Sequence, residues 1–272
     1  QPSITVTTIG FANANERAHL GYHLRHRREH HLSGIRKGGY ASSMASETPA
    51  KRPVFRARTL EHKTAHKAMI RSIRSEAELT YPYTGRSELS TGVIDAISNV
   101  PRHAFVPDES RTRAYDDRPL SIGYGQTISQ PFIVALMTDL LDLEPDARVL
   151  EVGAGSGYQA AVLAGVAANV FTVEWIPELA VAAKERLARL GYGNVRVRQG
   201  DGVEGWPGEA PFDGILLSCA TAEIPTSLIR QLAPGGRLIA PVGPQWTTQM
   251  LTVFAAGMEN EVSRRPVLPV AF

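Results

Sequence analysis

The fold is decided by Val149-Leu150-Glu151-Val152-Gly153-Ala154-Gly155-Ser156-Gly157-Tyr158-Gln159. A short apolar run passes directly into Gly-x-Gly-x-Gly, and a stretch with helical spacing follows. Glycine allows a sharp turn, and it lets a ligand approach where a Cβ atom would clash. In an open α/β sheet, a nucleotide-like ligand binds at this first strand–helix junction. We therefore expect a ligand-binding loop between a buried strand over 148–152 and a helix over 158–168.

The spacing of these glycines narrows the class of ligand. A dinucleotide fingerprint requires Gly-x-Gly-x-x-Gly, but Tyr158 occupies the position of its third glycine. A phosphate-binding P-loop requires Gly-Lys followed by Ser or Thr, which this stretch lacks. Two interpretations remain: a loop for another nucleoside-containing cofactor, and a glycine-rich turn without a ligand. The strand–loop–helix context favours the first.

Short apolar runs alternate with helical stretches along the second half of the chain. Further helices are expected over 177–190 and 224–231, and further strands over 170–174, 195–199, 212–218 and 236–241. Such alternation predicts an α/β fold with a doubly wound, mostly parallel sheet and right-handed crossovers. The last apolar runs, 250–254 and 267–272, have no helix between them, so they should form an antiparallel hairpin at one edge.

Three helices are expected before the sheet. Helical spacing predicts the first over 60–79, and Ser90 is a good N-cap for the second. The third should begin after Ser129, with Pro131 in its first turn. The segment 118–131 before it is rich in glycine and polar residues, and we expect it to be an ordered loop.

The net charge of +2 is the sum of two opposite parts. Residues 1–75 hold 14 Lys and Arg against 4 Asp and Glu, whereas residues 76–272 hold 15 against 23. The first part therefore carries +10 and the second −8, a basic appendage on an acidic body. We expect a flexible basic extension over 1–58 and one catalytic domain over 59–272, with helices over 59–145 and the sheet over 146–272. A solvated tail is favoured for the extension over a nucleic-acid-binding arm.

The cysteine count and the hydropathy exclude other classes. The single cysteine, Cys219, rules out an internal disulfide framework and a multi-cysteine zinc site, so no metal is expected. No apolar run approaches the roughly 20 residues that a membrane helix needs. A cytoplasmic protein, monomeric and without a membrane partner, is expected.

Acidic residues follow the second and third predicted strands. Glu174 ends one strand, where an acid can accept hydrogen bonds from ribose hydroxyls, and Asp201 with Gly202 follows the next. Either acid alone could be solvated or cap a helix, but together they favour a ligand site. Local sequence preferences alone favour the interpretation of Ser129 as a helix N-cap and of Thr127 as a turn residue.

Several segments resemble one family. Glu151 followed by the glycine loop resembles motif I of class I S-adenosylmethionine-dependent methyltransferases. Five segments together, in their order along the chain, resemble the protein-L-isoaspartate O-methyltransferases, a family of protein-repair enzymes. The resemblance covers about residues 86–272. The five segments are Val100-Pro101-Arg102-His103-Ala104-Phe105-Val106-Pro107, the Ile122-to-Pro131 loop, Glu151 to Gly157, Gly200-Asp201-Gly202 and Pro234-Gly235-Gly236.

The resemblance implies a Rossmann-like methyltransferase sheet and a set of site residues. Ser129 matches the family's active-site serine and is the implied catalytic residue. S-adenosyl-L-methionine is the implied cofactor and S-adenosyl-L-homocysteine its product. The implied cofactor-binding residues are Thr127, Ile128, Ser129, Gln130, Glu151, Gly153, Ala154, Gly155, Gly157, Glu174, Trp175, Asp201 and Gly202.

The implied reaction transfers methyl to the free α-carboxylate of L-isoaspartyl residues in damaged peptides and proteins, which starts their repair through a succinimide. Two alternatives stay open. One is a related class I methyltransferase with another carboxylate or a small-molecule acceptor, and the other is a non-enzymatic adaptor that uses the basic extension. Family members usually continue past the final strand with a segment that lines the peptide site. This chain ends at Val270-Ala271-Phe272, so we expect that wall to be shortened.

Overall fold

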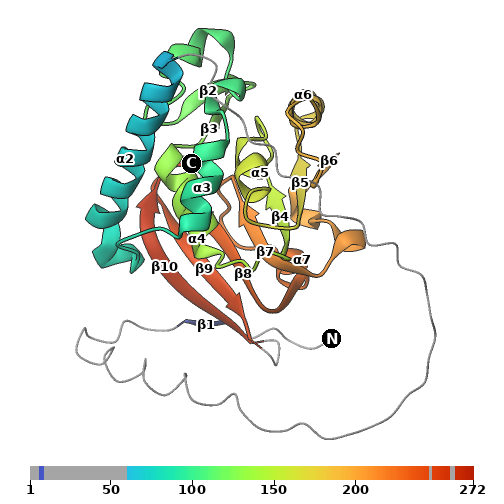
Figure 1. Cartoon of the computed structure of the whole chain (residues 1–272). Helices are drawn as coiled ribbons and strands as arrows, with labels where there is room; N and C mark the ends of the chain where they lie inside the picture. The colour runs from blue at the N-terminus through green and yellow to red at the C-terminus, as the bar shows by residue number, and fades with distance from the viewer. Residues whose placement is uncertain (1–5, 9–59, 245–246, 258–260) are drawn as a thin grey trace, which may run out of the picture.

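The computed structural model describes residues 6–8, 60–244, 247–257 and 261–272 (Figure 1). The flexibility expected over 1–58 falls outside these residues, apart from one short strand. In chain order the elements are β1 (Val6–Thr8), α2 (Leu60–Thr84), α3 (Thr91–Asn99), η1 (Arg102–Ala104), η2 (Asp108–Arg113), β2 (Leu120–Gly123), β3 (Gln126–Ile128), α4 (Pro131–Leu140), β4 (Arg148–Val152), α5 (Tyr158–Leu163), β5 (Asn169–Glu174), α6 (Pro177–Arg189), β6 (Val195–Gln199), η3 (Gly202–Glu204), η4 (Pro207–Glu209), β7 (Phe212–Leu217), α7 (Thr226–Ile229), β8 (Leu232–Val242), β9 (Gln249–Ala256) and β10 (Val262–Val270).

The main sheet has the predicted α/β architecture. Its strand order is β1-β10-β9-β8-β7-β4-β5-β6, and the strands from β8 to β6 are parallel. The strand β9 runs antiparallel to both β8 and β10, which confirms the C-terminal antiparallel pair. The sheet reverses its winding at β4, between β5 and β7, and this is where open α/β sheets bind ligands.

Two strands begin several residues before their predicted starts. The strand β8 begins at Leu232, which pairs with Phe212, and its register with β7 shifts before the pairing resumes at Arg237. The strand β10 begins at Val262, five residues before the predicted start, and it contains Pro266 and Pro269. Proline removes an N–H donor, so within sheets it is found at edge strands, strand starts and bulges. The pairing of β10 with β9 shifts register next to Pro266, which is consistent with this rule.

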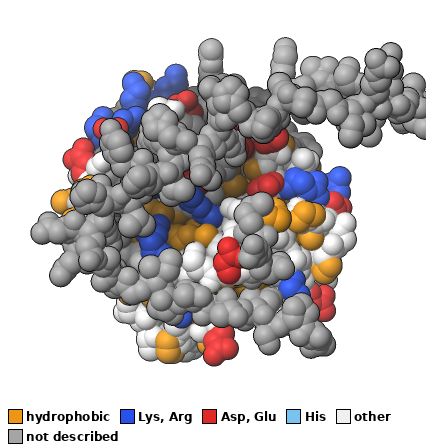
Figure 2. All heavy atoms as spheres, turned by 90° about the horizontal axis from the view of Figure 1, so that it is seen from below, with side chains coloured by type: hydrophobic (Ala, Val, Ile, Leu, Met, Phe, Trp, Pro, Cys, Tyr) orange, Lys and Arg blue, Asp and Glu red, His pale blue; other side chains and the backbone are white. Residues whose placement is uncertain are grey.

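Both faces of the sheet are buried, but more helices pack on one face than on the other. The helices from α2 to α6 contribute to one core cluster together with Val149 of β4, and α3, α4 and α5 lie in front of the sheet in Figure 1. The next residue, Leu150, belongs to the second cluster on the opposite face, as expected because successive strand residues point to opposite sides. The four-residue helix α7 contributes Leu228 to that cluster. Seen from below, hydrophobic side chains lie beside Lys or Arg side chains on the described part of the surface (Figure 2).

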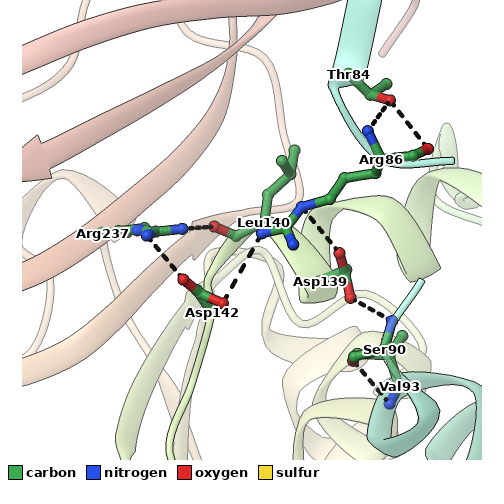
Figure 3. Close-up of polar contacts among 8 residues, drawn as sticks. All are labelled: Thr84, Arg86, Ser90, Val93, Asp139, Leu140, Asp142 and Arg237. Carbon is green, nitrogen blue, oxygen red and sulfur yellow. Dashed lines mark hydrogen bonds and ion pairs between the residues drawn. The ribbon is translucent and has the colours of Figure 1, made fainter. Parts of the chain in front are cut away.

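A buried carboxylate joins the first helices (Figure 3). The side chain of Asp139, near the end of α4, is 2% exposed, and its Oδ1 accepts a hydrogen bond from the backbone N–H of Ser90 at 2.8 Å. Its Oδ2 lies 3.3 Å from Nε of Arg86, which follows α2. The Ser90 hydroxyl accepts a hydrogen bond from the backbone N–H of Val93, which confirms the predicted N-cap of α3. Asp139 therefore fixes α2, α3 and α4 against one another.

The same corner is tied to the sheet. Asp142, just beyond α4, has a left-handed backbone (φ 56°), and its carboxylate lies 2.8 Å from Nη2 of Arg237 in β8. The guanidinium of Arg237 also donates to the carbonyl of Leu140 at 3.2 Å. The end of α4 is thus held between the helices before it and the middle of the sheet (Figure 3).

Replacing Asp139 should destabilise the protein much more than replacing Asp142. Asp139→Ala removes a buried carboxylate together with its hydrogen bond from the Ser90 N–H and its ion pair with Arg86, and should lower the free energy of unfolding by about 2–4 kcal/mol, as measured by urea denaturation. Asp142→Asn keeps a residue that tolerates a left-handed backbone and loses only an exposed ion pair, so the loss should stay below about 1 kcal/mol. Equal losses would contradict the role given to Asp139.

Candidate active site

A cavity of about 340 Å³ opens at the carboxyl ends of the parallel strands. It lies among the β3–α4 connection, the loop between β4 and α5, and the segments that follow β5, β6 and β7. The predicted site residues that line it are Thr127, Ile128, Ser129, Glu151, Gly153, Ala154, Gly155, Glu174, Trp175, Asp201 and Gly202. Two predicted residues, Gln130 and Gly157, are not among its lining residues.

The glycine loop turns through left-handed backbone conformations. Gly153 and Gly155 have φ values of 94° and 51°, a region that side chains rarely adopt. Gly157, with φ 85°, is the N-cap of α5, and a Cβ atom there would lie 3.1 Å from Cδ1 of Leu187 in α6. The first two glycines therefore shape the cavity wall, whereas Gly157 allows α5 to pack closely on α6.

Glu174 orients this loop from the neighbouring strand. Its carboxylate is 6% exposed, and Oε2 accepts a hydrogen bond from the N–H of Gly155 at 2.7 Å. Its Oε1 accepts from the N–H of Ile176 at 2.9 Å. Each carboxylate oxygen can accept a further hydrogen bond. Glu174 thus lies fixed at the cavity wall with free acceptor capacity for a diol.

The Gly200-Asp201-Gly202 segment, which follows β6, forms another part of the cavity wall at the same edge of the sheet. Asp201 Oδ1 accepts a hydrogen bond from the N–H of Val203 at 2.9 Å and so caps η3, which leaves its other oxygen free to accept. A Cβ atom on Gly202 would lie only 2.3 Å from Cγ1 of Val152, so this position admits glycine alone. Trp175 lies at the rim with 67% of its surface exposed, which leaves its ring available for stacking.

Glu151 is fully buried beneath the glycine loop. Its two oxygens accept hydrogen bonds from the hydroxyls of Thr172 at 2.7 Å and Ser218 at 3.1 Å. Burial raises the pKa of this carboxyl to about 8, and the nearby charge of Glu174 adds to the rise. Below that pH the carboxyl is neutral in the ligand-free protein. Cys219 also lines the cavity, where desolvation and the two glutamates raise the pKa of its thiol to about 11.

Ser129 lies in the cavity wall opposite these acids. The segment before it forms the hairpin β2–β3 instead of the expected loop, because Tyr124 and Gly125 make a two-residue turn with φ values of 54° and 70°. Gln130 is the N-cap residue of α4, so the interpretation of Ser129 as the cap is wrong. Among the described residues, no group hydrogen-bonds the Ser129 hydroxyl.

Sequence reasoning missed two polar residues behind Ser129. Asp117 supplies the cap of α4 from a distance, since its Oδ1 accepts from the N–H of Phe132 at 3.1 Å. Its Oδ2 accepts from the side-chain amide of Gln130 at 3.1 Å, which explains why Gln130 points away from the cavity. Arg102 is completely buried and donates to the carbonyl of Ser129 at 2.9 Å. The sequence feature that could have indicated this role is the position of Arg102, a charged residue within the largely apolar segment 100–107.

The described part of the chain contains neither a membrane-spanning helix nor a metal-binding cluster. None of its helices is long and apolar enough to cross a membrane. Nor does any group of three or more His, Cys, Asp or Glu side chains in these ranges have the arrangement of a metal site.

An open parallel sheet with a glycine loop after β4 and acids at the ends of the next two strands defines the class I methyltransferase fold. Within that class, the chain belongs to the protein-L-isoaspartate(D-aspartate) O-methyltransferase family, whose model matches residues 79–272.

Similar proteins support this membership. The chain is 52% identical over 208 residues to protein-L-isoaspartate O-methyltransferase 2 of Nitrosococcus oceani, a match that covers 76% of this chain and 94% of that protein. It is 50% identical to the protein of the same name from Syntrophobacter fumaroxidans, over 76% of this chain and 84% of that protein.

Solved structures agree with the fold. A protein-L-isoaspartate O-methyltransferase superposes with a TM-score of 0.67 at 27% identity, over 76% of this chain and 64% of that one, so the match spans less than two thirds of its length. A Plasmodium falciparum protein solved with S-adenosyl-L-homocysteine has a TM-score of 0.62 at 22% identity, over 78% and 96% of the two chains.

The raised pKa of Glu151 predicts a pH dependence of stability. Because the folded protein holds this proton more tightly than the unfolded chain, whose value is near 4.5, stability should fall as pH rises from about 4.5 to about 8. Glu151→Gln can keep both hydroxyl contacts and cannot ionise. In urea titrations of the ligand-free protein, the variant should therefore gain roughly 2–4 kcal/mol on the wild type across this range. Parallel pH curves would show that Glu151 is already ionised at pH 5.

Proposed function

We propose that the chain transfers a methyl group from S-adenosylmethionine to the free α-carboxylate of L-isoaspartyl residues in damaged proteins. The observation that carries the proposal is the placement of Ser129. It lines the same cavity as the glycine loop, and its hydroxyl has no partner within the described residues. Membership of the family supports the substrate class. The methyl ester carries a better leaving group than the carboxylate. The amide nitrogen of the next substrate residue can attack the ester carbonyl, the C–OCH3 bond breaks, and methanol leaves with the nitrogen's proton to give the succinimide.

The cavity residues fit the cofactor. The backbone at Gly153 and Gly155 leaves room for a ligand beside the loop, and Glu174 has acceptor capacity for two ribose hydroxyls. Asp201 would accept from the adenine amino group, and the exposed ring of Trp175 would lie beside the base. When bound, the cofactor supplies an electrophilic methyl group on a positively charged sulfur. Thr127, Ile128, Ala154 and Gly202 would complete the walls. Gln130 and Gly157 would act by holding α4 and α5.

The chain's contribution to catalysis would be alignment. A carboxylate acceptor is already ionised at neutral pH, so no strong base is required. The Ser129 hydroxyl would donate a hydrogen bond to this carboxylate and select the oxygen that attacks. Correct placement of the reacting atoms lowers a barrier by several kcal/mol.

Replacing Ser129 tests the proposal. Ser129→Ala should lower the turnover of an isoaspartyl peptide by about 10- to 100-fold, because the acceptor loses its hydrogen bond and its orientation. The affinity for S-adenosylhomocysteine, measured by calorimetry, should change less than about threefold. Ser121→Ala is a matched control, since Ser121 is an exposed residue of the same hairpin and does not line the cavity.

The substrate is tested with paired peptides. Radiolabelled methyl should pass to an isoaspartyl peptide but not to its normal aspartyl twin. Transfer to neither peptide would contradict the proposed substrate and favour a methyltransferase with another acceptor. Equal turnover by Ser129→Ala and the wild type would instead contradict only the role of the serine.

We also propose a cytoplasmic, monomeric enzyme with a basic extension over 1–58 and a catalytic domain over 59–272. The single cysteine supports a reducing compartment. The opposite charges of the two parts support their separation. The nucleic-acid-binding alternative for the extension predicts salt-sensitive binding by the full chain.

A further inference from the structure

Arg102 is a buried cation directly behind the proposed active-site residue. Its side chain lies in η1 and is completely inaccessible to solvent. Nε donates to the carbonyl of Ala114 at 2.8 Å, and Nη2 donates to the carbonyl of Ser129 at 2.9 Å. A longer hydrogen bond of 3.4 Å joins Nη2 to the carbonyl of Arg118. One planar group therefore binds three separate parts of the segment 114–129.

Stability alone does not account for this arrangement. A buried arginine is costly unless a carboxylate pairs with it, yet within the described residues no acidic side chain forms an ion pair with Arg102. Its Nη1 is buried without a hydrogen-bond partner. The guanidinium carbon instead lies 4.8 Å from the centroid of the Tyr158 ring. Tyr158 follows the glycine loop and lines the cavity. Arg102 therefore contacts both the segment that carries Ser129 and the helix that follows the glycine loop.

A second anchor fixes the chain on the other side of Ser129. Asp117 accepts hydrogen bonds from the N–H of Phe132 and from the side chain of Gln130, each at 3.1 Å. Arg102 fixes the carbonyl of Ser129 itself. The backbone is thus held at the carbonyl of Ser129 and at the N–H of Phe132, and the side chain of Gln130 is fixed between them. Only the side-chain torsion of Ser129 remains without a polar restraint.

We infer that Arg102 and Asp117 are positioning residues that set the place of the Ser129 hydroxyl relative to the bound cofactor. The inference rests on the proposed function of Ser129. A guanidinium has a rigid, planar set of donors, so it fixes the direction of the carbonyls that it binds. Methyl transfer needs close alignment, and a displacement of about 1 Å can cost a hundredfold in rate.

The test separates kcat from binding. Arg102→Met fills a similar volume without donors. With saturating S-adenosylmethionine and isoaspartyl peptide, kcat should fall at least about tenfold. The peptide KM and the Kd for S-adenosylhomocysteine should stay within about threefold of the wild type. A folded Arg102→Met enzyme with wild-type kcat would overturn the inference.

A destabilised control distinguishes positioning from a general loss of structure. Asp139→Ala removes a buried carboxylate away from the cavity, and it should keep kcat within about twofold at a temperature well below its unfolding transition. Equal losses of kcat in Arg102→Met and Asp139→Ala would overturn the inference, because destabilisation would then explain both.

Asp117→Ala provides an independent variant if Arg102→Met fails to fold. Asp117 is half-buried, and its loss frees the start of α4 while Arg102 keeps its hydrogen bonds to the backbone carbonyls. Its kcat should fall at least about fivefold, with the same unchanged binding constants. An unchanged kcat in this variant would overturn the inference. A wild-type enzyme without isoaspartyl activity would overturn the proposed function and this inference together, whereas active wild type with active variants overturns this inference alone.

Discussion

The guanidinium of Arg102 imposes the constraint on which the acceptor side of the cavity depends. A buried guanidinium that forms no ion pair among the described residues depends on backbone carbonyls and an aromatic face for its hydrogen bonds and contacts. In this chain Arg102 binds the carbonyls of Ala114 and of Ser129, the latter 27 residues away, and it lies over the ring of Tyr158. The path through η2 and the β2–β3 hairpin is therefore set by convergence on one planar group. The position of Ser129 follows from this, because its carbonyl is one of the groups that bind Arg102.

The cofactor side of the cavity is organised in a different way. There a buried anion, Glu174, binds the N–H groups of Gly155 and Ile176. A carboxylate that accepts from backbone amides keeps a glycine loop in one conformation although glycine itself is permissive. Tyr158 links this side to Arg102. The two walls consequently form one rigid frame before any ligand binds, which lowers the entropy that binding must offset.

Periodicity and local motifs could predict the sheet, the helices and most residues of the cavity. Glycines, an acid after each strand and an N-cap such as Ser90 act within a few residues, so the sequence displays them directly. Contacts between distant segments were not readable in this way. The cap that Asp117 gives to α4 spans 15 residues, and the carbonyls that bind Arg102 carry no side-chain signature. The N-cap interpretation of Ser129 was wrong for this reason, and Arg102 was quoted without a role.

The prolines of β10 have a consequence for the behaviour of the protein in concentrated solution. A strand at the rim of a sheet offers a ladder of donors and acceptors to any passing chain, and this is a common start of aggregation. Among the described residues, β1 pairs with β10 only from Val262 to Arg264, so the later part of β10 forms the edge. Pro266 and Pro269 have no N–H to offer there, and Arg265 adds a charge beside them. This part of β10 is thereby a poor template for another molecule. A protein whose proposed substrates are damaged and partly unfolded chains can meet them at its cavity without recruiting them into a growing sheet.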